Sequence, residues 1–129
     1  MAAPTVFWDA WREQVKPLFP MLHGHQQKAL AWMVRGIVLS GSAVLQRMAE
    51  GLYGIGSTTM PSIERRLARF VANERITPTL VWNEFLAQVL PFWLQRRVFL
   101  VLDATPLADR ATIVYLGLLL PSRVLPLAW

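Results

Sequence analysis

The sequence contains no cysteine, which excludes a fold built on a framework of disulfide bonds. Its N-terminus also lacks the charged segment and apolar core of a signal peptide. The longest stretches without charge, residues 51–63 and 111–122, are shorter than the roughly 18 apolar residues that a membrane span needs. We therefore expect a soluble, cytoplasmic protein with no membrane partner.

Charged residues are scarce as well, since they make up 16% of the chain against 54% hydrophobic residues. This composition leaves little polar surface for a monomer of 129 residues, so we expect some apolar faces to meet a partner or further chain. Thirteen lysines and arginines outnumber eight acidic residues. Most of these cations are arginines, which bind phosphate through paired N–H donors, and this balance favours a nucleic-acid partner.

Apolar residues recur at helical spacing over the first three quarters of the chain. The pattern predicts five helices, at residues 5–19, 26–39, 42–52, 61–73 and 79–95. The residues expected to separate, cap, bend or interrupt them are 23–25 as a break, Ser42 as an N-cap, Pro61, Thr77 and Pro78 at helix starts, and Pro91 as a bend or an interruption.

After residue 97 the pattern changes from helical to extended. Apolar runs predict three strands, at residues 98–102, 112–119 and 124–127, and their short connections require antiparallel neighbours. The first run suits a strand buried on both faces that ends at Asp103, with a turn beginning at residues 104–106. We therefore expect an α+β fold with a helical region, 1–96, followed by a strand region, 97–129.

The fourth predicted helix has two chemically different sides. On a helical wheel its apolar residues gather on one side, and Arg65, Arg66, Arg69 and Asn73 gather on the other. A helix of this kind, preceded by two helices and a tight turn, is typical of a small DNA-binding module related to the helix-turn-helix. The alternative is that the charged side is simply solvated.

Asp103 is the acidic residue with the most informative position. A carboxylate at the mouth of a rigid sheet is well placed to bind a divalent metal, although a turn carboxylate more often bonds to its own backbone. Asp109 lies in the following loop, where the second explanation is the better one. The pair His23 and His25 is too small a ligand set for a zinc site.

Four segments carry a resemblance to a known family. Residues 100–107 read Leu-Val-Leu-Asp-Ala-Thr-Pro-Leu and precede Asp109 and Arg110, an apolar strand at 112–119, and Ser-Arg-Val-Leu-Pro-Leu-Ala-Trp at 122–129. Upstream, residues 62–70 read Ser-Ile-Glu-Arg-Arg-Leu-Ala-Arg-Phe. In this order and spacing, the chain resembles the N-terminal part of an insertion-sequence transposase of the DDE type over about residues 26–129.

The resemblance implies an RNase H-like catalytic core in which three carboxylates hold two divalent metals, usually Mg²⁺. Asp103 matches the first of these carboxylates, which makes it the implied catalytic residue and metal ligand. The other two acids have no counterpart in the chain, so the implied RNase H-like sheet is incomplete. We therefore expect a truncated transposase that binds the double-stranded DNA of transposon ends and is inactive alone.

Two other classes of protein compete with this interpretation. One is a stand-alone DNA-binding regulator, or an inhibitor of a full-length transposase, whose strands serve for self-association or for association with that transposase. The other is a basic structural or membrane-surface protein. The second is disfavoured because the arginines concentrate on one helix and do not run along an amphipathic surface helix.

Overall fold

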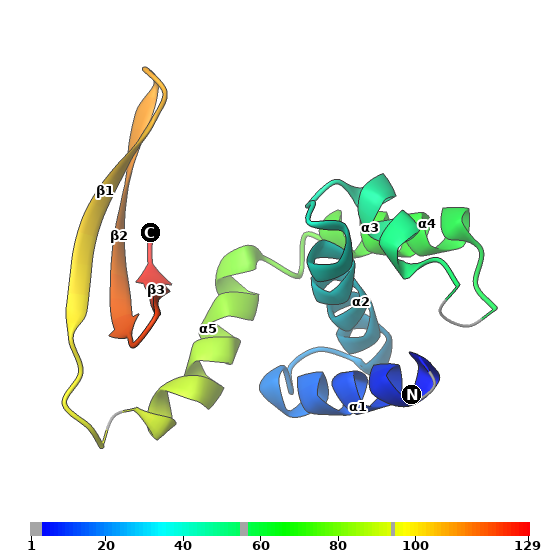
Figure 1. Cartoon of the computed structure of the whole chain (residues 1–129), viewed down its shortest axis with the longest axis horizontal. Helices are drawn as coiled ribbons and strands as arrows, with labels where there is room; N and C mark the ends of the chain where they lie inside the picture. Colours follow the sequence, from blue (N-terminus) through cyan, green and yellow to red (C-terminus); the bar gives the residue numbers. More distant parts are fainter. Residues whose placement is uncertain (1–3, 55–56, 94) are drawn as a thin grey trace. The chain divides into compact units, whose positions relative to one another are not determined.

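A computed structural model of the chain describes residues 4–54, 57–93 and 95–129. These residues form an α+β fold of five α-helices and a three-stranded antiparallel sheet, which confirms the predicted class (Figure 1). In chain order the elements are α1 (Pro4–Val15), η1 (Lys16–Leu18), α2 (Gly24–Ser40), α3 (Leu45–Leu52), α4 (Met60–Val71), α5 (Pro78–Val89), η2 (Leu90–Phe92), β1 (Leu100–Leu107), β2 (Ala111–Leu120) and β3 (Arg123–Ala128).

Contacts divide the chain into two compact units, Met1–Phe85 and Leu86–Trp129, here named the helical unit and the strand unit. The division falls within α5, whereas the sequence places the boundary at the change from helical to extended pattern near residue 97. Each unit has its own internal packing and is described by itself below.

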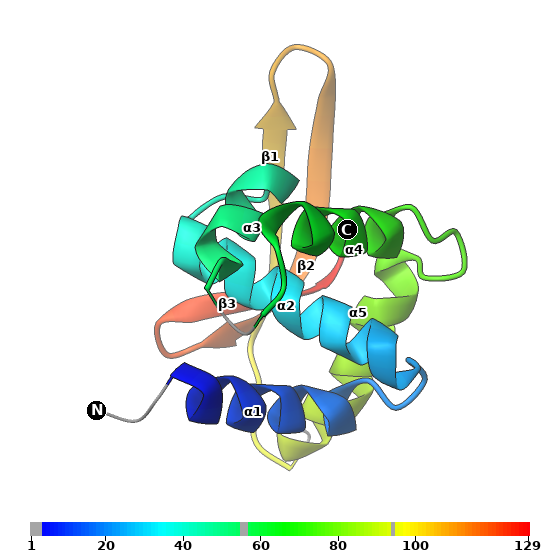
Figure 2. The same ribbon diagram turned by 90° about the vertical axis from the view of Figure 1, so that its right-hand side faces the viewer.

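Helix α2 is the centre of the helical unit, where it packs against α1, α3 and α4 (Figure 2). Its contribution to the core is the buried run Leu30, Ala31 and Trp32. Helix α4 adds Ile63 and Leu67, which are 1% and 0% exposed. Because these two residues lie one turn apart, they fix which side of α4 faces the core and which faces solvent.

Helix α3 approaches α2 so closely that one position of α2 has room only for glycine. A Cβ added at Gly36 would lie 2.9 Å from Cβ of Met48 and 3.2 Å from its backbone atoms. Met48 itself is buried, so it has no open space into which to move. The two helices meet at 89°.

No single helix within the described ranges is long and apolar enough to cross a membrane. Helices α2 and α3 reach that length and hydropathy only when they are counted together, across the bend between them.

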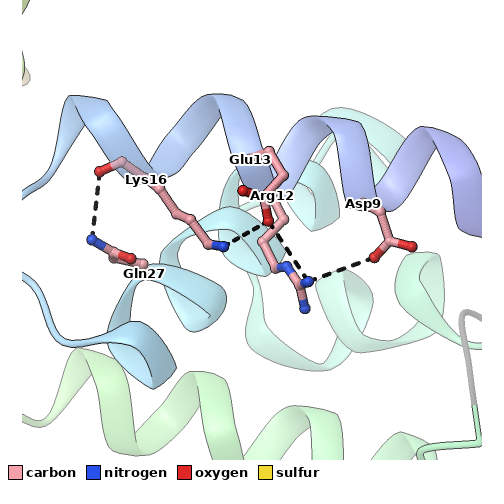
Figure 3. A network of polar contacts seen from close by, with 5 residues as sticks. All are labelled: Asp9, Arg12, Glu13, Lys16 and Gln27. Carbon is pink, nitrogen blue, oxygen red and sulfur yellow. Dashed lines mark hydrogen bonds and ion pairs between the residues drawn. The ribbon is translucent and has the colours of Figure 1, made fainter.

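Helix α1 is held on α2 by polar contacts as well as by apolar ones. The indole Nε1 of Trp11 donates to the carbonyl oxygen of Ala31 at 3.1 Å. The amide Nε2 of Gln27 donates to the carbonyl oxygen of Lys16 at 3.4 Å (Figure 3). It also donates to the carbonyl oxygen of Phe19 at 3.0 Å. Each of these carbonyl oxygens also accepts a backbone N–H, from Phe19 and Leu22 respectively, so Gln27 adds a second hydrogen bond to both and ties this segment to α2.

Ion pairs run along the exposed side of α1 (Figure 3). Arg12 pairs with Asp9 and with Glu13 at 3.8 Å each, and Lys16 donates to Glu13 at 2.6 Å. The hydrogen bond from Lys16 lowers the pKa of the Glu13 carboxyl. Solvent screens such pairs, so the acids of α1 serve mainly to balance local charge.

The start of α2 corrects one sequence prediction. Residues 23–25 were expected to break the helix, but α2 begins at Gly24 with His23 as its N-cap. The physical reason is that Oε1 of Gln26 accepts the backbone N–H of His23 at 2.9 Å, as in the returning half of a capping box. Gly41, at a φ of 64°, ends the helix in the left-handed region that glycine adopts without strain.

Three further helix boundaries can be compared with their predictions. Ser42 is not the N-cap of α3, because α3 begins at Leu45 and the Ser42 hydroxyl accepts the Val44 N–H at 3.2 Å. Thr77 does cap α5 as predicted, since its hydroxyl accepts the N–H of Leu80 at 3.2 Å. Pro91 lies in η2 and α5 ends at Val89, so of the two predicted effects of Pro91 the structure shows the interruption.

The strand unit contains one antiparallel sheet in the order β1-β2-β3, which confirms the predicted pairing. The bounds of β1 correct the prediction, because β1 begins at Leu100 and continues through residues 104–106, where a turn was expected. The turn lies at residues 108–110. The expectation of burial on both faces is also wrong: β1 is an edge strand, and only Val101 is half-buried.

Both edges of the sheet carry a proline at an outward position. The Leu119 N–H donates to the carbonyl oxygen of Phe99 at 2.9 Å. Every second residue after Phe99 therefore turns its backbone N–H and C=O groups toward β2. Pro106 lies at one of the positions between these residues, so its backbone faces away from β2. The pair Leu120–Arg123 closes the turn to β3, and the same alternation turns the backbone of Pro126 outward. Each edge therefore lacks one N–H for pairing with an added strand.

We expect Gly36→Ala to lower the free energy of unfolding by about 1–3 kcal/mol, because the new methyl group overlaps Met48. Chemical unfolding followed by far-ultraviolet circular dichroism measures this change. Gly24→Ala is the matched control, since nothing lies within 4 Å of an added Cβ there. Equal stability of the two variants would contradict the close approach of α2 and α3.

Replacing both edge prolines should increase self-association. The double variant Pro106→Thr and Pro126→Thr restores an N–H at each outward position, so we expect higher-order species in light scattering at concentrations where the wild type shows fewer. Pro20→Thr, in a turn of the helical unit, is the control and should leave scattering unchanged. Unchanged scattering in the double variant would show that the prolines do not protect the edges.

Candidate nucleic-acid interface

The exposed side of α4 carries the three arginines that the sequence singles out. Arg65, Arg66 and Arg69 are all exposed, whereas Ile63 and Leu67 of the same helix are buried. The helix begins with Met60 and Pro61, whose fixed φ suits a first turn. The sequence therefore predicted the exposure of the three arginines correctly.

Asn73 lies beyond the end of α4 and not on its face. The helix ends at Val71, and Oδ1 of Asn73 accepts the backbone N–H of Arg75 at 3.1 Å. This bond is a local turn of the kind that asparagine makes two residues along the chain. The predicted extension of the helix to residue 73 is therefore wrong, although Asn73 remains near the arginines in a shared hollow.

Two cations lie over one indole ring at the contact between α2 and α4. Nζ of Lys28 is 5.2 Å from the ring centroid of Trp32, and Cζ of Arg66 is 5.1 Å from it. Lys28 and Trp32 are four residues apart on α2, so they share one side of that helix. Both distances are within the roughly 6 Å over which a cation is attracted to an aromatic face.

A hollow of about 590 Å³ lies between the first turns of α2 and the second half of α4. Its lining contains four basic side chains, two amide side chains and an apolar floor. The lining residues are His25, Gln26, Lys28, Ala29, Trp32, Arg66, Arg69, Phe70 and Asn73. Arg65 is not among them, so the arginines of α4 divide into a pair at the hollow and one on the open surface.

The hollow is a concentration of positive charge. Within the described ranges, no ion pair joins Lys28, Arg66 or Arg69 to an acidic side chain. Partial burial, and then the charges of Arg66 and Arg12, hold the pKa of Lys28 below its ordinary value. A group of cations that repel one another in this way is stabilised by a bound anion.

Two members of this group, Lys28 and Trp32, were not predicted from the sequence. Trp32 is 5% exposed and belongs to the core. What the sequence did not show is that the same ring also supports cations from two helices. The spacing of Lys28 and Trp32 is the only local signal, and their contact with Arg66 depends on how α2 and α4 pack.

Asp103 occupies the middle of β1, not the end of a buried strand as expected. Its Oδ1 accepts the backbone N–H of Ala104 at 2.8 Å, and its Oδ2 accepts the hydroxyl of Tyr115 at 3.3 Å. Tyr115 is the directly opposite residue on β2. The carboxylate is therefore an exposed side chain whose two oxygens both accept bonds within the sheet.

The described residues do not fit the metal site that the resemblance implies. A two-metal site needs several carboxylates that converge on the ions. In the described part of the chain, no three side chains of histidine, cysteine, aspartate or glutamate gather in that way. Asp103 alone does not make such a site, and we derive no catalytic step through Mg²⁺.

Comparison with known proteins adds no relative to this description. No protein-family model, curated protein or solved structure matches the chain.

The chain with Mg²⁺ or Mn²⁺ should not nick supercoiled plasmid DNA above the level of its Asp103→Ala variant. The reason is that a single carboxylate leaves a divalent ion with most of its waters and fixes no geometry for attack on a phosphodiester. Gel electrophoresis of the plasmid measures nicking directly. Metal-dependent nicking that disappears in the variant would contradict this assignment of Asp103.

Proposed function

We propose that the helical unit binds duplex DNA through the exposed side of α4. The single observation that carries this proposal is the exposure of Arg65, Arg66 and Arg69 on one helix whose Ile63 and Leu67 are buried in the core. Three exposed guanidinium groups on one helix complement the negative charge of a DNA groove, where each phosphate accepts paired hydrogen bonds.

The packing of the preceding helices supports the proposal. Helices α2 and α3 meet at 89° and are joined by residues 41–44, which include Gly41. This angle is close to the lower end of the range of helix-turn-helix pairs, about 90–120°, which also have short turns that often contain glycine. The arrangement of α2, α3 and α4 is therefore suited to presenting a helix to a groove.

Helix α4, and not α3, carries the charge that DNA binding needs. Within α3 the only basic residue is Arg47, and Glu50 offsets it. Helix α4 has three exposed arginines and one acid, Glu64, which is half-buried. We infer that the α2–α3 pair positions α4, and that α4 makes the contacts with DNA.

Most of these contacts are expected to be with phosphates. Arginine reads guanine edges in the major groove, but contacts with the sugar-phosphate backbone are the commoner use of basic side chains. Phosphate contacts give affinity without sequence preference, and the affinity falls with salt because bound counterions are released. The proposal therefore predicts binding to duplexes of any sequence.

The resemblance in sequence extends the proposal to a biological setting. It makes transposon ends the natural DNA partner and the cytoplasm the place of action, with Asp103 as the counterpart of the first catalytic carboxylate. The two hydrogen bonds that Asp103 accepts within the sheet favour the second candidate instead. That candidate is a DNA-binding regulator or inhibitor of a transposase.

The triple variant Arg65→Ala, Arg66→Ala and Arg69→Ala tests DNA binding. In a mobility-shift and anisotropy titration with duplex DNA, we expect the shift to be lost at moderate salt. The slope of log affinity against log salt should decrease by about 3, one for each phosphate contact removed. Circular dichroism should retain the helical signal, because none of the three side chains is buried.

The matched control is a second triple variant that removes the same number of positive charges from the strand unit. Arg96, Arg97 and Arg123 are exposed arginines of the strand unit, and their replacement by alanine also removes three charges. We expect this control to bind DNA nearly as well as the wild type. If the two triple variants lose the same affinity, net charge and not α4 is responsible, and the proposal is wrong.

A further inference from the structure

We propose that the hollow between α2 and α4 is a phosphate-binding site in which Lys28, Arg66 and Arg69 together hold one phosphate group. This deepens the proposed function and rests on it, since the phosphate is then one of the DNA backbone. The site includes Lys28, a residue outside α4 to which nothing in the sequence pattern assigned a role.

The indole of Trp32 brings two of the three cations to one place. It attracts Lys28 from its own helix and Arg66 from α4, at 5.2 and 5.1 Å from the ring centroid. A cation that lies over an aromatic face uses none of its hydrogen-bond donors in doing so. The N–H groups of both side chains therefore remain available to an anion.

The backbone positions of these cations are fixed by the core. Trp32 is buried on α2, and Ile63 and Leu67 hold α4 against the same core. Arg69 follows Arg66 by three residues, which places both on the same side of α4 and at the rim of the hollow. The site is thus assembled from two rigid helices, so little ordering is needed when a phosphate binds.

The positive charges around the hollow favour the binding of an anion. Lys28 faces Arg66 on α4 and Arg12 on α1, and both weaken its hold on a proton. The acids that face Arg12, namely Asp9 and Glu13, pair with it on the exposed side of α1. A phosphate between Lys28, Arg66 and Arg69 would replace their mutual repulsion by three charge-assisted contacts.

The size and lining of the hollow also suit a phosphate group. Its volume of about 590 Å³ is within the usual range of ligand sites, roughly 300–1,000 Å³. The amide side chains of Gln26 and Asn73 lie among the cations, and Phe70 and Ala29 provide apolar wall. This lining can accommodate the sugar-phosphate chain on either side of the bound group.

The experiment uses the fact that the chain has only two lysines, Lys16 and Lys28. With ¹³C-labelled lysine, each side chain gives its own NMR titration curve. The probes are inorganic phosphate and a duplex DNA, each added to the full chain. We expect the pKa of Lys28 to rise on addition of either probe, by on the order of one unit, because a phosphate favours the charged ammonium. The side-chain NMR signal of Lys16 is the internal control and should not respond to either probe.

Variants at the two lysines give an independent readout. Lys28→Gln should weaken DNA binding by about tenfold, the order expected for one lost charge-assisted contact. Lys28→Arg should restore most of the affinity because it keeps the charge. Lys16→Gln, which removes the same charge on η1, should have little effect.

The outcomes separate this inference from the proposed function. A shift of Lys28 with DNA supports a backbone phosphate, and a shift with inorganic phosphate alone supports a site for free phosphate and counts against DNA binding. If neither probe moves Lys28 and Lys28→Gln binds DNA like the wild type, the phosphate site is refuted. DNA binding through α4 would then be tested by the triple arginine variant alone.

Discussion

The packing of the Trp32 ring, where α2 meets α4, is the interaction on which the rest of the helical unit depends. The ring is part of the core, so its position is set by the packing that makes the unit fold. The same ring supports the ammonium of Lys28 and the guanidinium of Arg66. One buried side chain thus links the stability of the helices to the arrangement of charge on their surface, and the candidate site inherits the rigidity of the core.

Clustered cations in a compact unit repel one another, and this repulsion opposes folding unless it is balanced. The acids of the helical unit that form ion pairs lie on α1, where they balance Arg12 and Lys16. The side of α4 with Arg65, Arg66 and Arg69 has no such balance within the described ranges. Attraction to an aromatic ring relieves part of the repulsion at no cost in hydrogen-bond donors. A polyanion relieves the remainder, which is the physical basis for assigning DNA as the partner.

Local pattern predicted the kinds of element well, and failed where a distant contact decides the outcome. Periodicity gave all five helices, because each has a clear apolar side, and the short connections gave an antiparallel sheet. Pro106 suggested a turn, yet it lies in β1, because an edge strand can turn the missing N–H outward. His23 suggested a break, but the side chain of Gln26 makes it a cap. The position of Lys28 beside Arg66 was not predicted, because Arg66 comes from another helix.

Mapping the contact surface on the folded chain is the most direct measurement of the central claim. Backbone amide spectra of ¹⁵N-labelled protein should be recorded during titration with a short DNA duplex. We expect the largest chemical-shift changes in two segments. These are the first turns of α2, from His25 to Trp32, and α4 together with the residues up to Asn73. Amides of β1, β2 and β3 should change little. Changes confined to the strand unit, or spread evenly over both units, would contradict a DNA interface built on α2 and α4.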